Sequence, residues 1–568
     1  MYVLPLSLSI PAAQIVSQAI LQGTNIQLNG QPWQGRWLKQ GEQFFVEERW
    51  AINALGMSFL PTAPSHSIQP RQRIKWFSPP QFLQVTFGVP ANYRYVALPT
   101  FANQWRITAQ GDTLQIATPP AKLQAIRASK QAWGDRLVVE LSAPVPFHLQ
   151  PSATGTVIVI HASSGGELAR PQFTGTVVRG LRLQSQGAIT VLSVDSLSAL
   201  VPQLDTLSHP YRLVIDYPSS PRVNSATEWA RGIRVIEQTV ELADSPAPFR
   251  IHALEVDLKQ GDVVMRPIWS NPLGMVGTSS LKAMAELWQA TAAINGGFFN
   301  RDRRLPVGAI RSQGQWLAGP ALTRGAIAWN ERGEVLIDRL NYSEQIVLPT
   351  GRVPISNLNS GYVQRGIARY TREWGEHYLT LTDNEILVLV QSNQITGQFQ
   401  AAQAGQSQIP IPHDGYLLVL RGVPELLPTL AIGTPVSLES RVSPSRFEQF
   451  PHLVGAGPLL LKNSQIVLDP LQEGFSPTFA EQRAIRSAIA TTQAGKVLLA
   501  TISAESTPPT LLQTALILQQ LGAVDALNLD GGSSAGLYLG GNFLNRENTS
   551  AIHNAIGVFL QPKLPKSR

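Results

Sequence analysis

Glycine and proline interrupt this chain so often that strands and turns are favoured over long helices. The 568 residues include 45 glycines and 42 prolines, and both residue types weaken or end a helix. Between these interruptions, apolar and polar residues alternate, as in strands. The length implies about three or four domains. We therefore predict a multidomain α+β protein, in which β-rich N-terminal modules precede a large mixed-sheet domain of catalytic type.

The charge distribution gives no sign of a nucleic-acid surface. The formal net charge of +7 suits anionic partners such as acidic glycans. The basic residues are spread out, however, and the densest internal group is Arg301, Arg303 and Arg304. A nucleic-acid surface would need a basic stripe interleaved with aromatic residues. We predict no nucleic-acid partner.

The composition excludes several kinds of site and bears on where the protein is found. The chain has no cysteine, which excludes disulfides, thiolate metal sites and cysteine nucleophiles. It has no run of about 18 apolar residues, so we predict no transmembrane segment. Residues 1–14 are similar to the back half of a secretory signal but lack its positively charged start. We predict an exported protein, periplasmic or extracellular, without a convincing signal peptide in this chain.

The first predicted domain spans residues 1–80. A strand leads into Asn29-Gly30, which is a strong hairpin signal, a strand is expected at 43–47, and a helix at 48–55 would end at Gly56. This order resembles the copper-amine-oxidase N-terminal-like module of exported bacterial proteins. The resemblance implies no copper here, because His66 is the only histidine of the segment, and we expect it in a solvated loop.

The second predicted domain spans residues 81–222 and is rich in alternating strands. Residues 135–141 and 211–217 look alike, each with an arginine, an apolar strand and an acid. The pattern is similar to the AMIN-type β module, which targets exported bacterial proteins to the envelope. An unrelated β-sandwich remains the alternative, because any such fold shows strands of this kind. Residues 218–221 are typical of a linker.

The third predicted domain, residues 223–568, contains two strand ends of the same design. Each is an apolar strand followed by a polar residue and two glycines, namely Asn295-Gly296-Gly297 and Asp530-Gly531-Gly532. Period-two alternation places Asn528 on the same side of its strand as Asp530. Glycines let a backbone approach a ligand closely. The alternative is an ordinary tight turn, in which Asp530 caps a backbone N–H.

The third domain also contains one clear helix and lacks several enzyme motifs. Thr507 can cap that helix, Pro508 suits its first position and Gly522 would end it. Leu512 is one of the apolar residues that we expect to face the core. There is no dinucleotide-binding glycine pattern, P-loop, zinc-helix histidine pair or serine-nucleophile elbow.

Four segments of the third domain, taken in order, resemble the phosphodiester glycosidase family. The resemblance covers most of residues 245–562. The family often has three glycines after the acid and then Ser-Ser-Thr, whereas here two glycines precede Ser533 and Ser534, and Ser487 stands where threonine is usual. The sugar pocket is therefore expected to differ in shape from that of better-known members. The segments are residues 295–299, 455–460, 486–490 and 527–534, and the closing strand fits 554–557.

This resemblance implies hydrolysis of the glycosidic bond in a sugar-1-phosphodiester. Because phosphate leaves readily, such a site needs cations for the phosphate and a carboxylate for the oxocarbenium-like centre or the water. Arg486 is the first candidate for the phosphate, since guanidinium binds it through two hydrogen bonds. Arg311 and Arg324 are weaker candidates. Asp530 is the candidate carboxylate, with Glu481 as its candidate partner.

The other candidates would bind substrate. Asn295 and Asn528 would orient sugar hydroxyls or water, and the glycine N–H groups would cradle an anion. Oxygen ligands of this kind suit Ca²⁺, but no dedicated cage is evident, so the metal stays unknown and no cofactor is predicted. The predicted substrate-binding residues are Asn295, Gly296, Gly297, Arg311, Asn528, Gly531, Gly532, Ser533, Ser534 and Asn554.

We therefore predict hydrolysis of a sugar-1-phosphodiester in envelope or exopolysaccharide metabolism. The partner would be a saccharide phosphodiester or a polysaccharide, including a cell-wall or envelope glycan. The alternative is a non-catalytic glycan-binding or cell-envelope scaffold protein. The enzyme interpretation requires Asp530, Arg486 and Asn295 to converge in one pocket, and it fails if they lie on separate surfaces.

Overall fold

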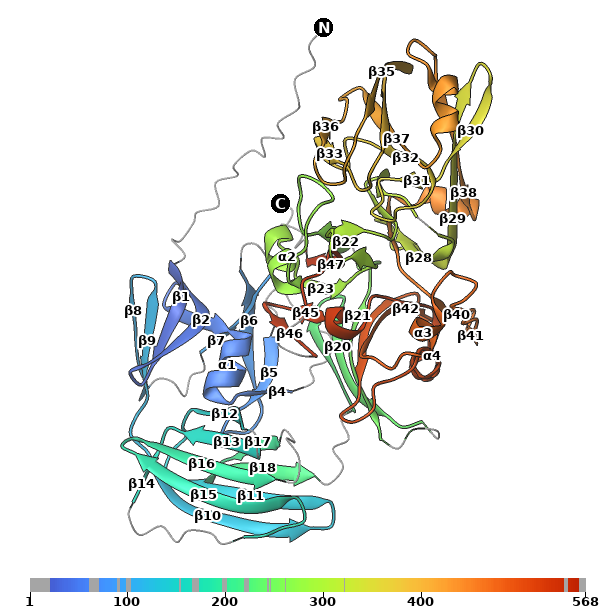
Figure 1. Ribbon diagram of the computed structural model, residues 1–568. Helices are drawn as coiled ribbons and strands as arrows, with labels where there is room; N and C mark the ends of the chain where they lie inside the picture. The colour runs from blue at the N-terminus through green and yellow to red at the C-terminus, as the bar shows by residue number, and fades with distance from the viewer. Residues whose placement is uncertain are drawn as a thin grey trace, which may run out of the picture. The chain divides into compact units, whose positions relative to one another are not determined.

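Two compact, strand-rich units make up the chain (Figure 1). The N-terminal unit comprises Met1–Gly88 and Arg94–Pro221, and the C-terminal unit comprises Val89–Tyr93 and Arg222–Arg568. The structure is a computed structural model. It describes residues 21–60, 71–88, 92–98, 104–152, 155–165, 173–196, 202–218, 224–242, 245, 247–260, 262–320, 322–545 and 550–560.

The first sheet of the N-terminal unit contains the predicted hairpin. Asn29 and Gly30 have φ values of 49° and 84°, as a tight two-residue hairpin turn requires. The predicted helix is α1 (Glu48–Leu55), and Gly56 ends it in the left-handed conformation. In order, the strands are β4 (Ser58–Phe59), β5 (Arg71–Lys75), β6 (Gln81–Phe87), β7 (Arg94–Ala97), β3 (Gln43–Glu47), β2 (Gln31–Gln40), β1 (Leu21–Leu28), β9 (Thr113–Ala117) and β8 (Arg106–Gln110).

Two further sheets complete the described part of this unit. The look-alike segments 135–141 and 211–217 are antiparallel neighbours, and Arg136 of one pairs with Asp216 of the other at 2.7 Å. One hydrophobic core joins these sheets to the first. One sheet contains β14 (Ser163–Ser164), β10 (Lys122–Gln131), β11 (Gly134–Leu141), β18 (Tyr211–Pro218) and β17 (Gln203–Leu207); the other contains β12 (Phe147–Ser152), β13 (Gly155–Ile160), β16 (Ile189–Ser196) and β15 (Val178–Gln186).

Two sheets of the C-terminal unit deliver the two Gly-Gly turns. Helix α4 (Leu511–Gln520) packs on the larger of these sheets. Its strands, in spatial order, are β19 (Asn224–Ala230), β20 (Ile233–Val240), β21 (Phe249–Val256), β43 (Val497–Ser503), β42 (Arg486–Thr492), β44 (Ala523–Asn528), β40 (Leu459–Lys462) and β41 (Gln465–Ile466). Helix α2 (Leu281–Trp288) packs on the smaller sheet. The strands of that sheet, in spatial order, are β22 (Val263–Trp269), β47 (Asn554–Leu560), β23 (Ala292–Asn295), β45 (Leu537–Leu539) and β46 (Asn542–Phe543).

Helix α4 begins later than the sequence predicted. Thr510, not Thr507, caps it: the Thr510 hydroxyl accepts from the Gln513 N–H, and the Gln513 side chain accepts from the Thr510 N–H. Two prolines precede this cap, and a proline disfavours helical geometry in the residue before it. Of the predicted apolar stripe, Leu511 and Ala515 face the core, whereas Leu512 is 50% exposed.

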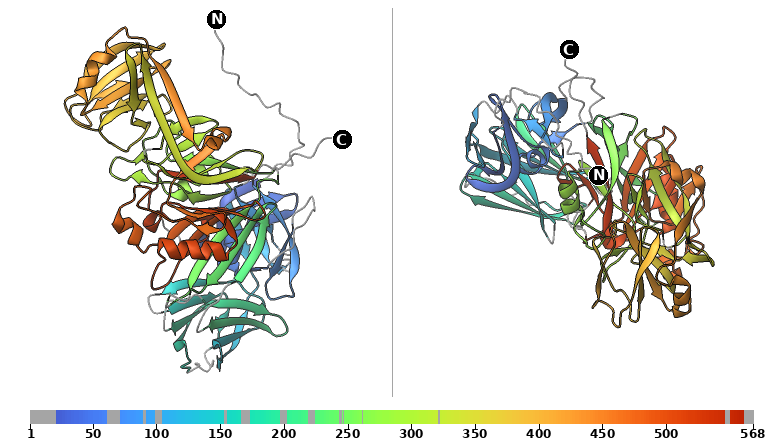
Figure 2. Two further views of the ribbon diagram at one scale, coloured as in Figure 1. Left: turned by 90° about the vertical axis from the view of Figure 1, so that its right-hand side faces the viewer. Right: turned by 90° about the horizontal axis from the view of Figure 1, so that it is seen from above.

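The long strand β29 (Val335–Leu348) belongs to one of the two remaining large sheets and packs against the other through Ile346 and Leu348 (Figure 2). The strands of the sheet that contains β29 are, in spatial order, β27 (Gln315–Ala318), β26 (Ile310–Ser312), β39 (His452–Gly455), β28 (Arg324–Trp329), β29 and β30 (Gly351–Ile355). Strand β38 (Ser437–Ser443) also pairs with β29. The strands of the other sheet are, in spatial order, β31 (Asn357–Leu358), β32 (Gly366–Tyr370), β37 (Gly415–Arg421), β34 (Ile386–Gln391) and β35 (Gln394–Gln400). The short elements are β24 (Phe299–Asn300), β25 (Leu305–Pro306), β33 (His377–Leu379), β36 (Gln408–Pro410), α3 (Pro477–Glu481), η2 (Pro424–Leu430), η3 (Ser445–Gln449) and η4 (Gly532–Ser534).

The coarse prediction of a multidomain chain with several sheets is confirmed, and the chain contains less helix than the α+β label implies. The described helices are all too short to span a membrane. The signal-like start, His66 and most of the linker lie outside the described residues. The three-domain division and the two N-terminal module resemblances stay predictions.

Candidate active site

The two strand ends of the same design meet, although they belong to different sheets. The Asp530 N–H donates to the Gly296 carbonyl at 3.0 Å, and the Asn295 side-chain amide donates to the Asp530 carbonyl at 2.5 Å. The latter two residues are 235 positions apart in the sequence. Folding therefore joins both predicted motifs into one cluster of turns.

Asn295 is fully buried, and contacts within the protein occupy its side chain. Besides the bond to Asp530, its side-chain oxygen accepts from the Ser487 hydroxyl at 2.6 Å and from the Gly536 N–H at 3.0 Å. A buried amide with such partners is a rigid positioning element. Asn295 holds the Asp530 turn against β42, and a sugar hydroxyl would have to displace one of these bonds to reach it.

Asn554 positions the first Gly-Gly turn. Its side-chain oxygen accepts from the Gly297 N–H at 2.8 Å, and its backbone carbonyl accepts from the Gly296 N–H at 2.9 Å. A Cβ on Gly296 would lie 2.1 Å from that side-chain oxygen. A Cβ on Gly297 would lie 2.1 Å from the Gly455 carbonyl, so neither position accepts a side chain. These two N–H groups are bonded to protein oxygens and are not directed at an open anion position.

The Asp530 carboxylate lies in a half-buried position that favours its protonated form. Burial raises the pKa of this carboxyl, while the Ser534 hydroxyl, the Arg301 guanidinium and the Gly531 N–H act in the opposite direction. Arg301 also donates to the Ser533 hydroxyl at 3.3 Å. A raised pKa brings a carboxyl group closer to the pH at which it can exchange protons with a substrate or water.

Arg486 is a buried cation for which the described residues provide no acidic partner. Its exposure is 1%, and burial lowers its pKa to about 10. Nη2 donates to the Gln482 carbonyl, and Nε has no hydrogen-bond partner among the described residues. The guanidinium lies 5.8 Å from the centre of the Phe479 ring. A buried charge without a counter-ion is costly, and a bound oxyanion would offset that cost.

Gly531 lets the Asp530 turn lie against Arg486. A Cβ on Gly531 would lie 2.9 Å from the Ile485 carbonyl and 3.7 Å from Cδ of Arg486. The next residue is held as well, since the Gly532 N–H donates to the Ile485 carbonyl at 2.7 Å. The backbone segments that carry Asp530, Arg486 and the positioning residue Asn295 thus lie close together, and the convergence of their side chains in one pocket stays a prediction.

Asn528, two residues before Asp530 at the end of β44, has a buried side chain that is only partly hydrogen-bonded. Its side-chain amide donates to the Gly457 and Leu529 carbonyls, both at 2.8 Å. Its side-chain oxygen is buried and has no partner in the described part of the chain. Buried acceptors normally have a partner in protein or water, so this oxygen is available to a water molecule or a ligand hydroxyl.

Two predicted residues have no contact with the cluster among the described interactions. Glu481 is the exposed last residue of α3. Arg311 donates to the Gly314 and Phe447 carbonyls and lies over the Trp316 ring at 5.3 Å. These contacts stabilise the β26–β27 turn. Roles of Glu481 and Arg311 toward a substrate stay predictions.

Two residues near the cluster were not selected from the sequence as site residues. Arg301 lies four residues after Gly297, and that proximity in sequence was the available signal. Glu473 gave no such signal, because its partners are distant in sequence. Its carboxylate accepts from the Gly325 N–H at 2.8 Å, the Leu459 N–H at 2.9 Å and the Arg339 Nε at 3.0 Å. Glu473 is therefore a structural carboxylate.

The described residues contain no group of three or more His, Asp or Glu side chains that could hold a metal ion. The oxygen atoms at the Asp530 turn include its carboxylate and the Ser533 and Ser534 hydroxyls. Ca²⁺ takes about six to eight oxygen ligands. These residues do not by themselves form a calcium cage.

Fold and site together define a strand-rich protein that places a carboxylate on a turn and a buried guanidinium at the start of the adjoining strand β42. The family model for phosphodiester glycosidases matches residues 390–559, a shorter range than the sequence led us to expect. A hypothetical protein from Synechocystis is 37% identical, with a TM-score of 0.81 over 95% of this chain and 99% of that chain. Residues 390–559 therefore belong to the phosphodiester glycosidase family.

Two other solved structures are more distant. A Burkholderia pseudomallei protein described as exported is 16% identical, with a TM-score of 0.46 over 81% of this chain and 100% of that chain. The zebrafish N-acetylglucosamine-1-phosphodiester alpha-N-acetylglucosaminidase catalytic domain, auto-inhibited by its pro-peptide, is 14% identical, with a TM-score of 0.31 over 64% of this chain and 89% of that chain. No curated protein matches the chain significantly.

Proposed function

We propose that the C-terminal unit hydrolyses the glycosidic bond of a sugar-1-phosphodiester. The observation that carries this proposal is the buried Arg486, which lacks an acidic partner among the described residues and adjoins the turn of Asp530. Phosphate matches a guanidinium in charge and geometry. Membership of the phosphodiester glycosidase family supports a hydrolase.

In the proposed reaction, the phosphate binds at Arg486 and the anomeric carbon faces Asp530. As the C1–O bond breaks, its electron pair passes to the leaving phosphate, whose charge Arg486 stabilises. Asp530 stabilises the oxocarbenium-like carbon or directs the attacking water. Water supplies the new hydroxyl on C1, and its other proton passes to Asp530 or solvent. Arg301 adds positive charge beside the carboxylate.

The isotope label of the product tests which bond is cleaved. Purified full-length chain is incubated in ¹⁸O-water with a panel of sugar-1-phosphodiesters, and with bis(4-nitrophenyl) phosphate as the control that lacks a sugar. We expect ¹⁸O in the released sugar and no turnover of the control. Label in the phosphate would show phosphodiester cleavage at phosphorus and overturn the proposal. Binding without turnover across the panel would favour the glycan-binding alternative.

We further propose that this activity serves envelope or exopolysaccharide metabolism outside the cytoplasm. The resemblance of the two N-terminal segments to modules of exported bacterial proteins supports this location. We expect the tagged full-length protein in the periplasmic or extracellular fraction of its native cells. Co-fractionation with a cytoplasmic marker would contradict it.

A further inference from the structure

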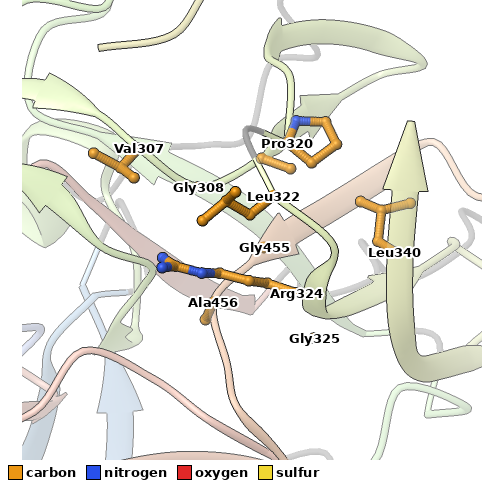
Figure 3. Close-up of a pocket in the computed structure, with 10 residues that line it drawn as sticks. Val307, Gly308, Pro320, Leu322, Arg324, Gly325, Leu340, Gly455 and Ala456 are labelled. Carbon is orange, nitrogen blue, oxygen red and sulfur yellow. The ribbon is translucent and has the colours of Figure 1, made fainter. Parts of the chain in front are cut away.

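A pocket in the C-terminal unit contains a second arginine, Arg324. Figure 3 shows its side chain extended along the pocket, with the guanidinium directed away from Leu340. Arg324 is the only charged residue among those that line the pocket within the described chain, and the other side chains are apolar. The lining residues are Val307, Gly308, Ala309, Pro320, Leu322, Arg324, Gly325, Leu340, Gly455 and Ala456.

Arg324, like Arg486, has no carboxylate partner of its own among the described residues. Its Nε donates to the backbone carbonyl of Glu473 at 3.1 Å and its Nη2 to the carbonyl of Gly474 at 3.2 Å. The Glu473 carboxylate is instead bonded to Arg339 at 3.0 Å. The pocket therefore offers a cation whose charge no adjacent carboxylate neutralises by direct pairing.

An aromatic cluster, Phe298, Phe475 and Phe479, links the two arginines. Arg324 lies 3.9 Å from the centre of the Phe475 ring, and Arg486 lies 5.8 Å from that of Phe479. The Phe475 and Phe479 rings stack at 4.7 Å, and Phe298 meets both edge-on at 5.4 and 5.7 Å. Guanidinium groups thus flank a continuous aromatic cluster.

The pocket wall also lies against the first Gly-Gly turn, which is hydrogen-bonded to Asp530. Gly308 and Gly455 line the pocket. A Cβ on Gly308 would lie 2.4 Å from the Gly455 carbonyl, and a Cβ on Gly297 would lie 2.1 Å from the same atom. Gly296, next to Gly297, accepts from the Asp530 N–H. The pocket is therefore connected to the Asp530 turn through the backbone of the first Gly-Gly turn.

We propose that the Arg324 pocket binds a second anionic group of the substrate, on the leaving-group side of the phosphate held by Arg486. This inference rests on the proposed function and narrows its substrate class to phosphodiesters whose leaving group carries a further phosphate or carboxylate. The guanidinium pairs with that anion. Val307, Leu322 and Leu340 contact the carbon skeleton that bears it.

Simple two-ended anions test this pocket without knowledge of the sugar. Binding of hexyl phosphate, hexane-1,6-diyl bisphosphate and 6-phosphonooxyhexanoate to the full-length protein is measured by titration calorimetry. We expect at least one two-ended ligand to bind about tenfold more tightly than hexyl phosphate, as one charge-assisted contact allows. The tighter of the two identifies phosphate or carboxylate as the preferred second anion. Equal affinity for all three would overturn the pocket assignment.

Variants separate the pocket from general electrostatic attraction. Arg324→Gln should abolish the preference for two-ended ligands, and Arg324→Lys should retain part of it. The matched control is Arg266→Gln, which removes a half-buried arginine that lies 5.9 Å from the Phe559 ring and should keep the preference. Leu322→Glu leaves Arg324 in place and should abolish the preference by repulsion. A preference that survives Arg324→Gln or Leu322→Glu would overturn the assignment.

Failure of the proposed hydrolysis can be distinguished from failure of the pocket assignment. If the unaltered chain prefers two-ended anions but hydrolyses no sugar-1-phosphodiester, hydrolysis is wrong and the anion pocket is supported. If it hydrolyses these substrates without any preference for two-ended anions, the pocket assignment is wrong and hydrolysis is supported.

Discussion

The turns at Asn295 and Asp530 have the same sequence design and different structural roles. Both follow an apolar strand and both continue into two glycines. Asn295 is fully buried and bonded to three other residues, whereas Asp530 keeps a half-buried carboxylate with a raised pKa. The comparison shows that a pattern can locate a site while leaving open which residue reacts and which one positions it.

The chemistry of the two side chains explains this division. A carboxamide donates and accepts at once, so Asn295 can donate to the Asp530 carbonyl while it accepts from Ser487 and Gly536. An ionised carboxylate only accepts and could not replace it. Asp530 instead supplies the charge that an amide lacks.

Asp530→Asn should give the largest effect and tests the reactive half of the comparison. We expect kcat/KM for a sugar-1-phosphodiester to fall at least about a thousandfold, or about 4 kcal/mol, because the carboxylate is lost. The backbone bonds to Gly296 and Asn295 remain, so the melting temperature should change little. Full activity in this variant would remove Asp530 from the chemistry.

Asn295→Ala tests the positioning half. It leaves the Ser487 hydroxyl, the Gly536 N–H and the Asp530 carbonyl without this partner, which should cost about 3 kcal/mol of unfolding free energy. Urea denaturation followed by fluorescence measures it. Unchanged stability combined with a loss of substrate affinity would instead show that Asn295 contacts the sugar, as the sequence predicted.

Arg486→Met should separate function from stability. Loss of the phosphate contact should lower kcat/KM about a hundredfold, or about 2.7 kcal/mol, without lowering the melting temperature, because a buried charge without an acidic partner is removed.

The matched control is Arg369→Met. Arg369 forms a buried pair with Glu344 at 2.7 Å, so its loss should destabilise the fold by about 3 kcal/mol or more. Thermal unfolding of both variants shows whether loss of Arg486 destabilises the fold less than loss of Arg369. Equal destabilisation would mean that Arg486 has a structural role.

Gly297→Ala and Gly532→Ala compare the glycines of the two turns. A Cβ on Gly297 meets the Gly455 carbonyl at 2.1 Å, whereas one on Gly532 meets no atom within 4 Å, although φ is 61° there. We expect losses of about 2 kcal/mol and about 1 kcal/mol respectively, measured by urea denaturation. The reverse order would contradict the close contact at Gly297.

The smallest expected effect is a pH dependence of stability. Because folding raises the pKa of Asp530, the folded state binds this proton more tightly than the unfolded state. The stability of the unaltered chain relative to Asp530→Asn should therefore be greatest in acid and fall as pH rises through the raised pKa. Melting temperatures of both proteins across the acidic range measure this difference. An opposite slope would show that the folded protein favours the ionised carboxylate.

The sequence by itself determined features that depend on neighbouring residues. The Asn29-Gly30 hairpin and the helix ended by Gly56 were predicted correctly, because turn and cap preferences are local. The two Gly-Gly strand ends and the family were likewise recognisable from short segments. The cap at Thr507 was wrong, because Thr510 offers a reciprocal capping box that Thr507 does not form.

Only the tertiary structure decided which polar groups are buried and what they contact. Ser487 bonds to Asn295 across 192 positions, and Glu473 bonds to Gly325 across 148, so no local pattern reveals either pair. The same holds for Arg324 and Arg486, whose shared aromatic cluster comes from separate segments. Burial sets the cost of a charge and the availability of a donor, and burial depends on the whole fold.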